Sequence, residues 1–241
     1  KCLGGTDGDY FKSVLQSGDG GYMLAGHTRS NDIDVSGNHG FVDFWVVKLD
    51  SAGTIQWQKC LGGTSEEAAN SIQPTIDGGY IVAGETYSND GDVSGNHGLT
   101  DYWVAKLDST GNIQWQKCLG GTGYDIAQSV QQTADGGYVA AGYSNSNDGD
   151  VTGHHGGNDY WIVKLDNVGD LQWQKSLGGT GIDEASSITQ TTGGGYLVAG
   201  SSSSNDGDVT GFHGGSDYWV VKLDGIGNIQ WEKCFGGTVS D

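Results

Sequence analysis

The sequence predicts an all-β protein made of β-propeller-type blades with four strands each. Three observations predict this class: a 58-residue repeat, short apolar segments between glycine-rich turns, and the lack of any sustained 3.6-residue apolar period. The repeat is marked by KCLGGT at 1–6, 59–64 and 117–122, by KSLGGT at 175–180 and by KCFGGT at 233–238. The chain therefore reads as one repeat array over 1–241, with repeats 1–58, 59–116, 117–174 and 175–232 and a partial fifth repeat at 233–241.

Each repeat contains four segments with the composition of short strands. In the second repeat these segments are Ala69–Thr75, Tyr80–Thr86, Asp101–Leu107 and Ile113–Leu119. Asp77-Gly78-Gly79 forms the first turn, because glycine accepts a positive φ there, and Asp108-Ser109-Thr110-Gly111 forms the last. Four consecutive antiparallel strands make one propeller blade. An open superhelical stack of the same units is the alternative, because it satisfies the same local pattern.

Two features follow from the position of the repeat boundaries. Lys1 lies where the other repeats have a fourth strand, so the chain is expected to start inside such a strand. Residues 1–9 and 233–241 occupy the same repeat positions and would compete for one place in a closed four-blade ring. The sequence therefore favours a longer array, or a unit whose ends pair with neighbouring copies.

The composition excludes several partners. The 241 residues carry a formal net charge of −19 with only 11 Lys and Arg, and this argues against nucleic acids and anionic membrane surfaces. No apolar run approaches the length of a membrane span, so we expect no membrane insertion. The 8 Trp and 11 Tyr residues are enough to build a hydrophobic core.

An acidic loop between the second and third strands carries the strongest chemical signal. In the second repeat it reads DGDVSGNHGLTD, and its oxygen-bearing positions 1, 3, 5, 7 and 12 match the order of ligands in an EF-hand calcium loop. Position 7 varies among the repeats, as expected for a ligand that uses its backbone carbonyl. The pattern predicts about four Ca²⁺ ions, one per loop. The predicted ligands are Asp32, Asp34, Ser36, Asn38 and Asp43; Asp90, Asp92, Ser94, Asn96 and Asp101; Asp148, Asp150, Thr152, His154 and Asp159; and Asp206, Asp208, Thr210, Phe212 and Asp217.

The acidic loop can also be explained without a bound metal ion. Position 12 is Asp rather than the Glu of EF-hands, and the flanking segments are strands, so the likeness is limited to the loop itself. The alternative is an Asx-rich turn whose carboxylates accept hydrogen bonds from nearby backbone groups. A histidine recurs at position 8, and we expect it to pack or form hydrogen bonds rather than bind the metal. These histidines are His39, His97, His155 and His213.

Tryptophan and cysteine recur at fixed repeat positions. One tryptophan row lies in the third strand and a second row lies in the fourth; both are expected in the core between blades, whereas exposed rings could instead stack on sugars. The rows are Trp45, Trp103, Trp161 and Trp219, and Trp57, Trp115, Trp173 and Trp231. The cysteines are expected to be small buried thiols, because equivalent positions of successive repeats are too far apart for a disulfide. They are Cys2, Cys60, Cys118 and Cys234, with Ser176 at the fifth position.

The segment DGGYIVAG…DYWVAKLDSTGNIQWQKCLGG (77–121) resembles the propeller-like repeats of large secreted bacterial surface proteins. That resemblance covers the whole chain. The stretch KLDSTGNIQW (106–115) is also similar to the LDxxTGxxxW signature of pyrroloquinoline-quinone-type propellers, in which the tryptophan docks between blades. It implies a propeller-like blade and a structural role for Trp115, and it does not imply binding of the quinone.

These observations favour a protein that is not an enzyme. The sequence has no GxSxG, HExxH, CxxC or P-loop motif, and no glutamate recurs in every repeat. We expect a calcium-stabilised, extracellular or cell-surface repeat protein that acts as a structural or adhesive array or fibre subunit and associates with itself or with neighbouring repeats. The alternative is a lectin-like, carbohydrate-binding propeller that uses the third-strand aromatic residues to bind glycans.

Overall fold

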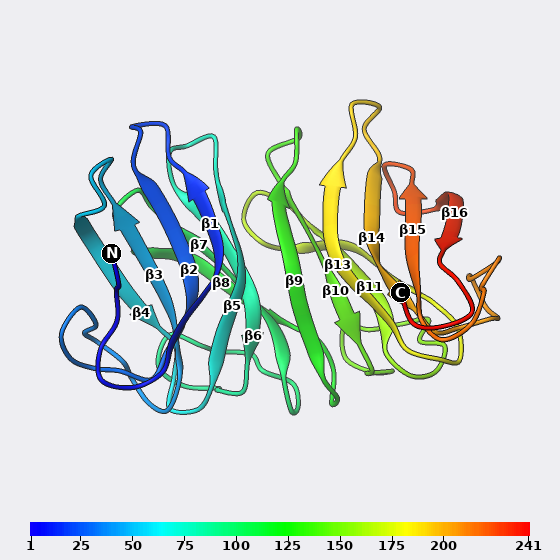
Figure 1. The fold of residues 1–241 in the computed structure, drawn as a ribbon, viewed down its shortest axis with the longest axis horizontal. Coiled ribbons are helices and arrows are strands. Elements are labelled where there is room, and N and C mark those ends of the chain that lie inside the picture. The colour runs from blue at the N-terminus through cyan, green and yellow to red at the C-terminus, as the bar shows by residue number, and fades with distance from the viewer. The chain divides into compact units, whose positions relative to one another are not determined.

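The computed structural model describes residues 1–241 and contains sixteen β-strands and no helix (Figure 1). The chain divides into two compact units, residues 1–119 and 120–241, and each unit holds two antiparallel four-stranded sheets. Within every sheet the strands are neighbours in chain order, as in propeller blades. The all-β, blade-type fold predicted from the repeat is confirmed.

Both units are built from strands of seven or eight residues. The first unit contains β1 (Asp9–Gln16), β2 (Tyr22–Thr28), β3 (Asp43–Leu49), β4 (Ile55–Leu61), β5 (Glu67–Pro74), β6 (Tyr80–Thr86), β7 (Asp101–Leu107) and β8 (Ile113–Leu119). The second contains β9 (Asp125–Gln132), β10 (Tyr138–Ser144), β11 (Asp159–Leu165), β12 (Leu171–Leu177), β13 (Asp183–Gln190), β14 (Tyr196–Ser202), β15 (Asp217–Leu223) and β16 (Ile229–Phe235).

The predicted strands of the second repeat agree closely with the structure. Three of them, β6, β7 and β8, have the predicted bounds, while β5 begins at Glu67 instead of Ala69 and ends at Pro74. The expectation that Lys1 starts inside a strand is wrong, because residues 1–8 form none. In the structure a fourth strand pairs only with the third strand of its own blade, and each of the four third strands already pairs with the fourth strand that follows it.

A bulge in the first strand of each blade sets the register of the sheet. In β5 the pairing shifts between Ala69 and Ser71, and this places Gly84 of β6 directly opposite Ala69. A Cβ atom on Gly84 would lie 1.9 Å from the carbonyl oxygen of Ala68, so only glycine fits there. Gly26, Gly142 and Gly200 occupy the same position in the other blades.

The core of each unit lies between its two sheets. In the first unit Phe44 of β3 packs against Trp103 of β7, with ring centroids 4.5 Å apart. In the second unit Tyr160 of β11 packs against Trp219 of β15 at 4.6 Å.

The chain contains no helix with the length and apolar character needed to cross a membrane.

Candidate functional site

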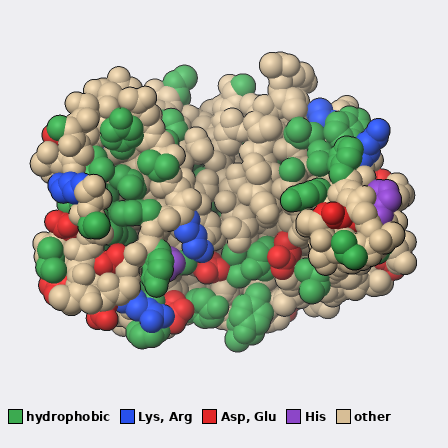
Figure 2. Space-filling view, in the orientation of Figure 1, with side chains coloured by type: hydrophobic (Ala, Val, Ile, Leu, Met, Phe, Trp, Pro, Cys, Tyr) green, Lys and Arg blue, Asp and Glu red, His purple; other side chains and the backbone are tan.

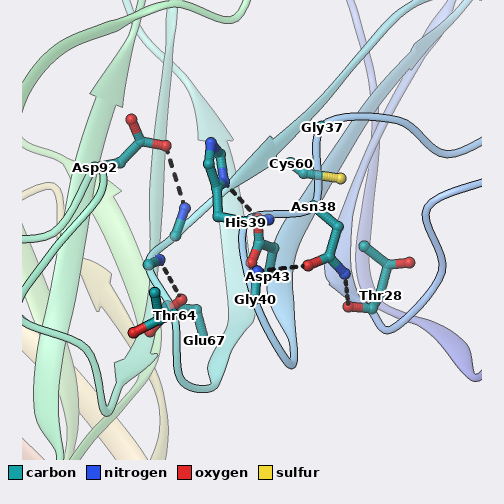
Figure 3. A network of polar contacts seen from close by, with 12 residues as sticks. Thr28, Gly37, Asn38, His39, Gly40, Asp43, Cys60, Thr64, Glu67 and Asp92 are labelled. Atoms are coloured by element: carbon teal, nitrogen blue, oxygen red, sulfur yellow. Dashed lines mark hydrogen bonds and ion pairs between the residues drawn. The ribbon is translucent and has the colours of Figure 1, made fainter.

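The aspartate at loop position 12 is the first residue of the third strand in every blade and is fully buried. In the first blade, Asp43 Oδ2 accepts hydrogen bonds from the backbone N–H of His39 at 3.0 Å, and lies 2.7 Å from His39 Nδ1 (Figure 3). The other three blades have the same pairs: His97 with Asp101, His155 with Asp159, and His213 with Asp217. The expectation that the repeated histidine forms hydrogen bonds is confirmed.

In three blades the second oxygen of this aspartate has no hydrogen-bond partner. Oδ1 is buried and unpaired in Asp43, Asp159 and Asp217. In the first unit a second buried carboxylate, Glu67 at the start of β5, lies beside Asp43. A Cβ atom on Gly62 would lie 3.0 Å from Asp43 Oδ1 and 2.3 Å from Glu67 Oε2, so the two oxygens flank the same point.

Hydrogen bonds hold Glu67 in this position. Its Oε2 accepts the backbone N–H of Gly63 at 2.8 Å, and its Oε1 accepts the hydroxyl of Thr86 at 2.8 Å. Burial raises the pKa of both the Asp43 and the Glu67 carboxyl above their ordinary values, against the hydrogen bonds that they accept. The site therefore concentrates acidic oxygens where water does not reach them.

The second unit repeats this arrangement between β11 and β13. A Cβ atom on Gly178 would lie 2.8 Å from Asp159 Oδ1 and 2.5 Å from Asp183 Oδ2. Burial raises the pKa of Asp159 above its ordinary value. His155 lies between two carboxylates here, with Nδ1 3.1 Å from Asp159 and Nε2 3.8 Å from Asp208.

Loop positions 1 and 3 bind the Gly-Gly-Thr segment that leads into the same blade. Asp90 accepts the backbone N–H and the hydroxyl of Thr64, each at 2.8 Å, and Asp92 Oδ2 accepts the N–H of Gly62 at 3.2 Å. The bonds from Thr64 lower the pKa of Asp90. The same contacts recur from Asp32, Asp148 and Asp206 to Thr6, Thr122 and Thr180, and from Asp34, Asp150 and Asp208 to Gly4, Gly120 and Gly178.

Positions 5 and 7 have partners of their own. Ser94 Oγ accepts a hydrogen bond from Gln116 Nε2 at 2.6 Å, and Ser36 and Thr152 are bound by Gln58 and Gln174 in the same way. In the last blade Thr210 donates to Glu232 instead. Asn38 and Asn96 donate to the carbonyls of Thr28 and Thr86, whereas His154 interacts with the Gly156 carbonyl and Phe212 has no polar side chain.

The predicted ligands are therefore distributed along the loop, and they are not gathered around one point. No group of three or more His, Cys, Asp or Glu side chains in the chain is placed to hold a metal ion. The donors best suited to a cation are the unpaired Oδ1 atoms of Asp43 and Asp159, each with the acid that begins the next blade. Sequence reasoning missed this second acid because it compared glutamates alone, although Asp or Glu occupies positions 9, 67, 125, 183 and 241.

The tryptophan and cysteine predictions are largely confirmed. The third-strand row of Trp45, Trp103, Trp161 and Trp219 is 0% exposed, and in the fourth-strand row only Trp231 is exposed, at 46%. All four cysteines are free. Cys60 and Cys118 are buried as expected, while Cys2 is exposed because residues 1–8 lie outside the sheet.

Comparisons with known proteins give distant likenesses. No protein-family model matches the chain. The regulatory protein FlaEY of Caulobacter vibrioides is 29% identical over 157 residues, which are 61% of this chain and 16% of that protein. The match to a protein of unknown function from Bacteroides caccae covers 84% of this chain and 57% of that protein's chain, with 15% identity and a TM-score of 0.47. The match to BamB from Moraxella catarrhalis covers 96% of this chain and 79% of the BamB chain, with 17% identity and a TM-score of 0.41.

Proposed function

We propose that this chain is a non-enzymatic repeat scaffold of the cell exterior, with a structural or adhesive role. The observation that carries the proposal is the repetition of one polar network, which each blade builds from the same positions. A catalytic site needs a set of residues found at one place in the protein. This chain instead repeats the same features in all four blades: the buried aspartate, the histidine bound to it, and the loop aspartates bound to the Gly-Gly-Thr segment. A network of this kind stabilises the blade and lets the array vary in length.

The resemblance to repeats of secreted bacterial surface proteins supports the extracellular location. The net charge of −19 also suits a protein that remains soluble outside the cell without binding polyanions. Millimolar calcium in that environment would fill sites of moderate affinity, which cytosolic calcium would leave largely empty. Location and calcium are therefore two parts of the same proposal.

We propose calcium as a stabilising ion, about one per repeat. In the first unit, Asp43 and Glu67 are the residues that would hold it, because Asp43 Oδ1 is buried without a hydrogen-bond partner beside a second buried carboxylate. Calcium prefers hard oxygen ligands, and its charge would offset the repulsion between the two acids. Asp159 and Asp183 would do the same in the second unit.

Thermal unfolding in calcium and in chelator tests this proposal. We expect calcium, but not magnesium at the same concentration, to raise the melting temperature of the full chain. Asp43→Asn should reduce this increment, whereas Asp50→Asn, at an exposed turn carboxylate, should keep it. An unfolding curve that is identical in calcium and in chelator would refute the calcium part.

The proposed partner is either a second copy of the chain or a neighbouring repeat of the same type. Electron microscopy in calcium and after chelation tests the first of these. Fibres that disperse on chelation would support a calcium-held array, while discrete particles in both conditions would contradict it. The lectin-like alternative uses the aromatic residues of the third strand to bind sugars. Their tryptophans are 0% exposed, and of the aromatic residues just before them only Tyr218 is exposed, at 58%. No observation in the structure favours glycan binding over the scaffold role, so we expect glycan arrays to remain unlabelled.

A further inference from the structure

The two faces of each blade have different chemistry. We call the face that bears the third-strand tryptophan the front face, and the face that bears the aromatic residue just before it the back face. Within each unit the back face of one blade is covered by the front face of the next, through contacts of β2 and β3 with β5 and of β10 and β11 with β13. These contacts show that the binding partner of a back face is the front face of another blade.

A slot over a glycine organises the contact. In the last blade Ala185, Gly200 and Trp219 lie side by side on adjacent strands. Tyr160 of the preceding blade enters above Gly200, since a Cβ atom there would lie 2.8 Å from the Tyr160 hydroxyl. The same hydroxyl donates to the carbonyl of Trp219 at 2.9 Å. An aromatic residue of the back face therefore fits a slot that small residues leave open.

The back face of β13–β16 has the same residues but no cover. Tyr218 is 58% exposed, whereas its equivalents Phe44 and Tyr160 are 0% exposed. Phe235 is 53% exposed, against 6% for Leu177 in the preceding blade. Figure 2 shows hydrophobic side chains at the surface over β15 and β16. A shallow groove of about 410 Å³ runs across this face between Ser187, Ala199, Tyr218 and Val220.

The segment after β16 makes the same contacts as the segment that leads from β12 into β13. Asp241 donates its backbone N–H to the Ser216 carbonyl at 2.9 Å, as Asp183 does to Asn158 at 2.7 Å where β13 begins. The Asp241 carboxylate accepts the N–H of Gly237, the counterpart of the bond from Gly179 to Asp183. The uncovered face and this segment thus correspond to the two parts of the third blade that contact the fourth: its back face and the segment that connects the two blades.

The front face of β1–β4 differs, because its slot is filled from within. Phe11 takes the position that Ala69 and Ala185 hold in later blades, and it lies across Gly26 from Trp45. Its ring stacks on Trp45 with a centroid distance of 4.7 Å and an interplanar angle of 19°. An aromatic residue of another back face cannot enter a slot that Phe11 occupies. The slot of the first blade is therefore closed by a side chain of the same blade, and we call this the Phe11 cap.

We propose that the back face of β13–β16 binds the front face of a further blade of this repeat, one with a small residue at the position of Phe11. Tyr218 enters the slot above the glycine of that blade and packs against its third-strand tryptophan. Continuity with the two blade contacts inside the units identifies the occupant, and the Phe11 cap rules out the first blade of a second copy. This inference goes beyond the scaffold role and does not depend on calcium.

A lengthened chain tests the proposal. A second copy of residues 184–241 is joined after Asp241, and tyrosine nitration is followed by mass spectrometry of peptides. We expect Tyr218 to react readily in the original chain and to become as unreactive as Tyr160 in the lengthened one. Hydrogen exchange should show a protected added blade.

The matched control is Ala185→Phe placed in the added copy alone, which imitates the Phe11 cap and should keep Tyr218 reactive. An added repeat that stays unprotected from exchange, or one that folds while Tyr218 still reacts, would overturn the proposal. So would a dimer of the original chain that Tyr218→Asp dissolves and Tyr124→Asp preserves, because a second copy would then be the occupant.

Discussion

The ammonium group of Lys106, a residue that is only 2% exposed, lies 2.9 Å from Asp77 Oδ2 in the turn between β5 and β6. It also donates to the Leu107 carbonyl and to Gln114, each at 3.0 Å. The first and third blades have the same ion pair, between Lys48 and Asp19 and between Lys164 and Asp135. In the fourth blade Gly193 replaces the aspartate, and Lys222 donates to the Leu223 carbonyl.

We predict that Asp77→Asn lowers the free energy of unfolding by about 1 kcal/mol at neutral pH, a value kept small because the carboxylate is half exposed. Burial alone would raise the pKa of Asp77, but hydrogen bonds from Thr75 and Lys106 outweigh it and lower the pKa from 3.8 to about 2. A lowered pKa means that the contribution is complete above about pH 4 and is lost as the pH falls toward 2. Urea unfolding of both proteins across this range measures the difference.

The difference between the two proteins should therefore disappear near pH 2. A difference that persists unchanged at that pH would contradict the proposed role of the carboxylate. Gly193→Asp provides the reverse change, since it supplies the missing partner of Lys222 in the fourth blade. It should raise the free energy of unfolding at neutral pH, and this gain should be lost as the pH falls from about 4 to 2.

Gly84→Ala should destabilise the first unit severely, because its Cβ atom would lie 1.9 Å from the backbone oxygen of Ala68. Gly78→Ala is the matched control: it has open space around it and a φ of 82°, so we expect a cost of about 1 kcal/mol from backbone strain alone. Circular dichroism during thermal unfolding compares the two variants. Equal losses would show that the bulge does not require glycine at Gly84.

The features that the sequence predicted correctly are those that repeat locally. The bounds of β6 and β7 follow from turn residues such as Gly78 and from the 58-residue period, and both signals lie within a few residues of the strands. The burial of Trp103 follows from its recurrence beside an aromatic residue. Local chemistry of this kind is visible without a structure.

The site was harder to predict because its members are far apart in the chain. Asp43 meets Glu67, which is 24 residues later in the next repeat, and no motif joins the two. The EF-hand pattern predicts that Asp90 and Asp92 face one shared ion, whereas in the structure they accept hydrogen bonds from Thr64 and Gly62. Spacing along the chain could not reveal that these acids have backbone partners.

The free cysteines should differ sharply in reactivity. Burial, with smaller contributions from Asp43 and Asp9, raises the pKa of the Cys60 thiol to about 12, and burial likewise raises the pKa of Cys118. Cys2 is exposed. At pH 8 we expect iodoacetamide to label Cys2 within minutes, and Cys60 and Cys118 only after addition of denaturant. Peptide mass spectrometry measures the order, and early labelling of Cys60 would contradict it.

Phe11→Ala should open the slot beside Trp45. Because Phe11 is only partly buried, we expect a loss of about 1–2 kcal/mol in the free energy of unfolding, less than for a fully buried aromatic residue. Water that enters above Gly26 should also shift the tryptophan emission to longer wavelength. Tyr10→Ala is the control, since that ring is 59% exposed and contacts His27 instead, with the ring centroids 5.1 Å apart. If both variants lose the same stability and neither changes the emission, Phe11 does not cap the first blade.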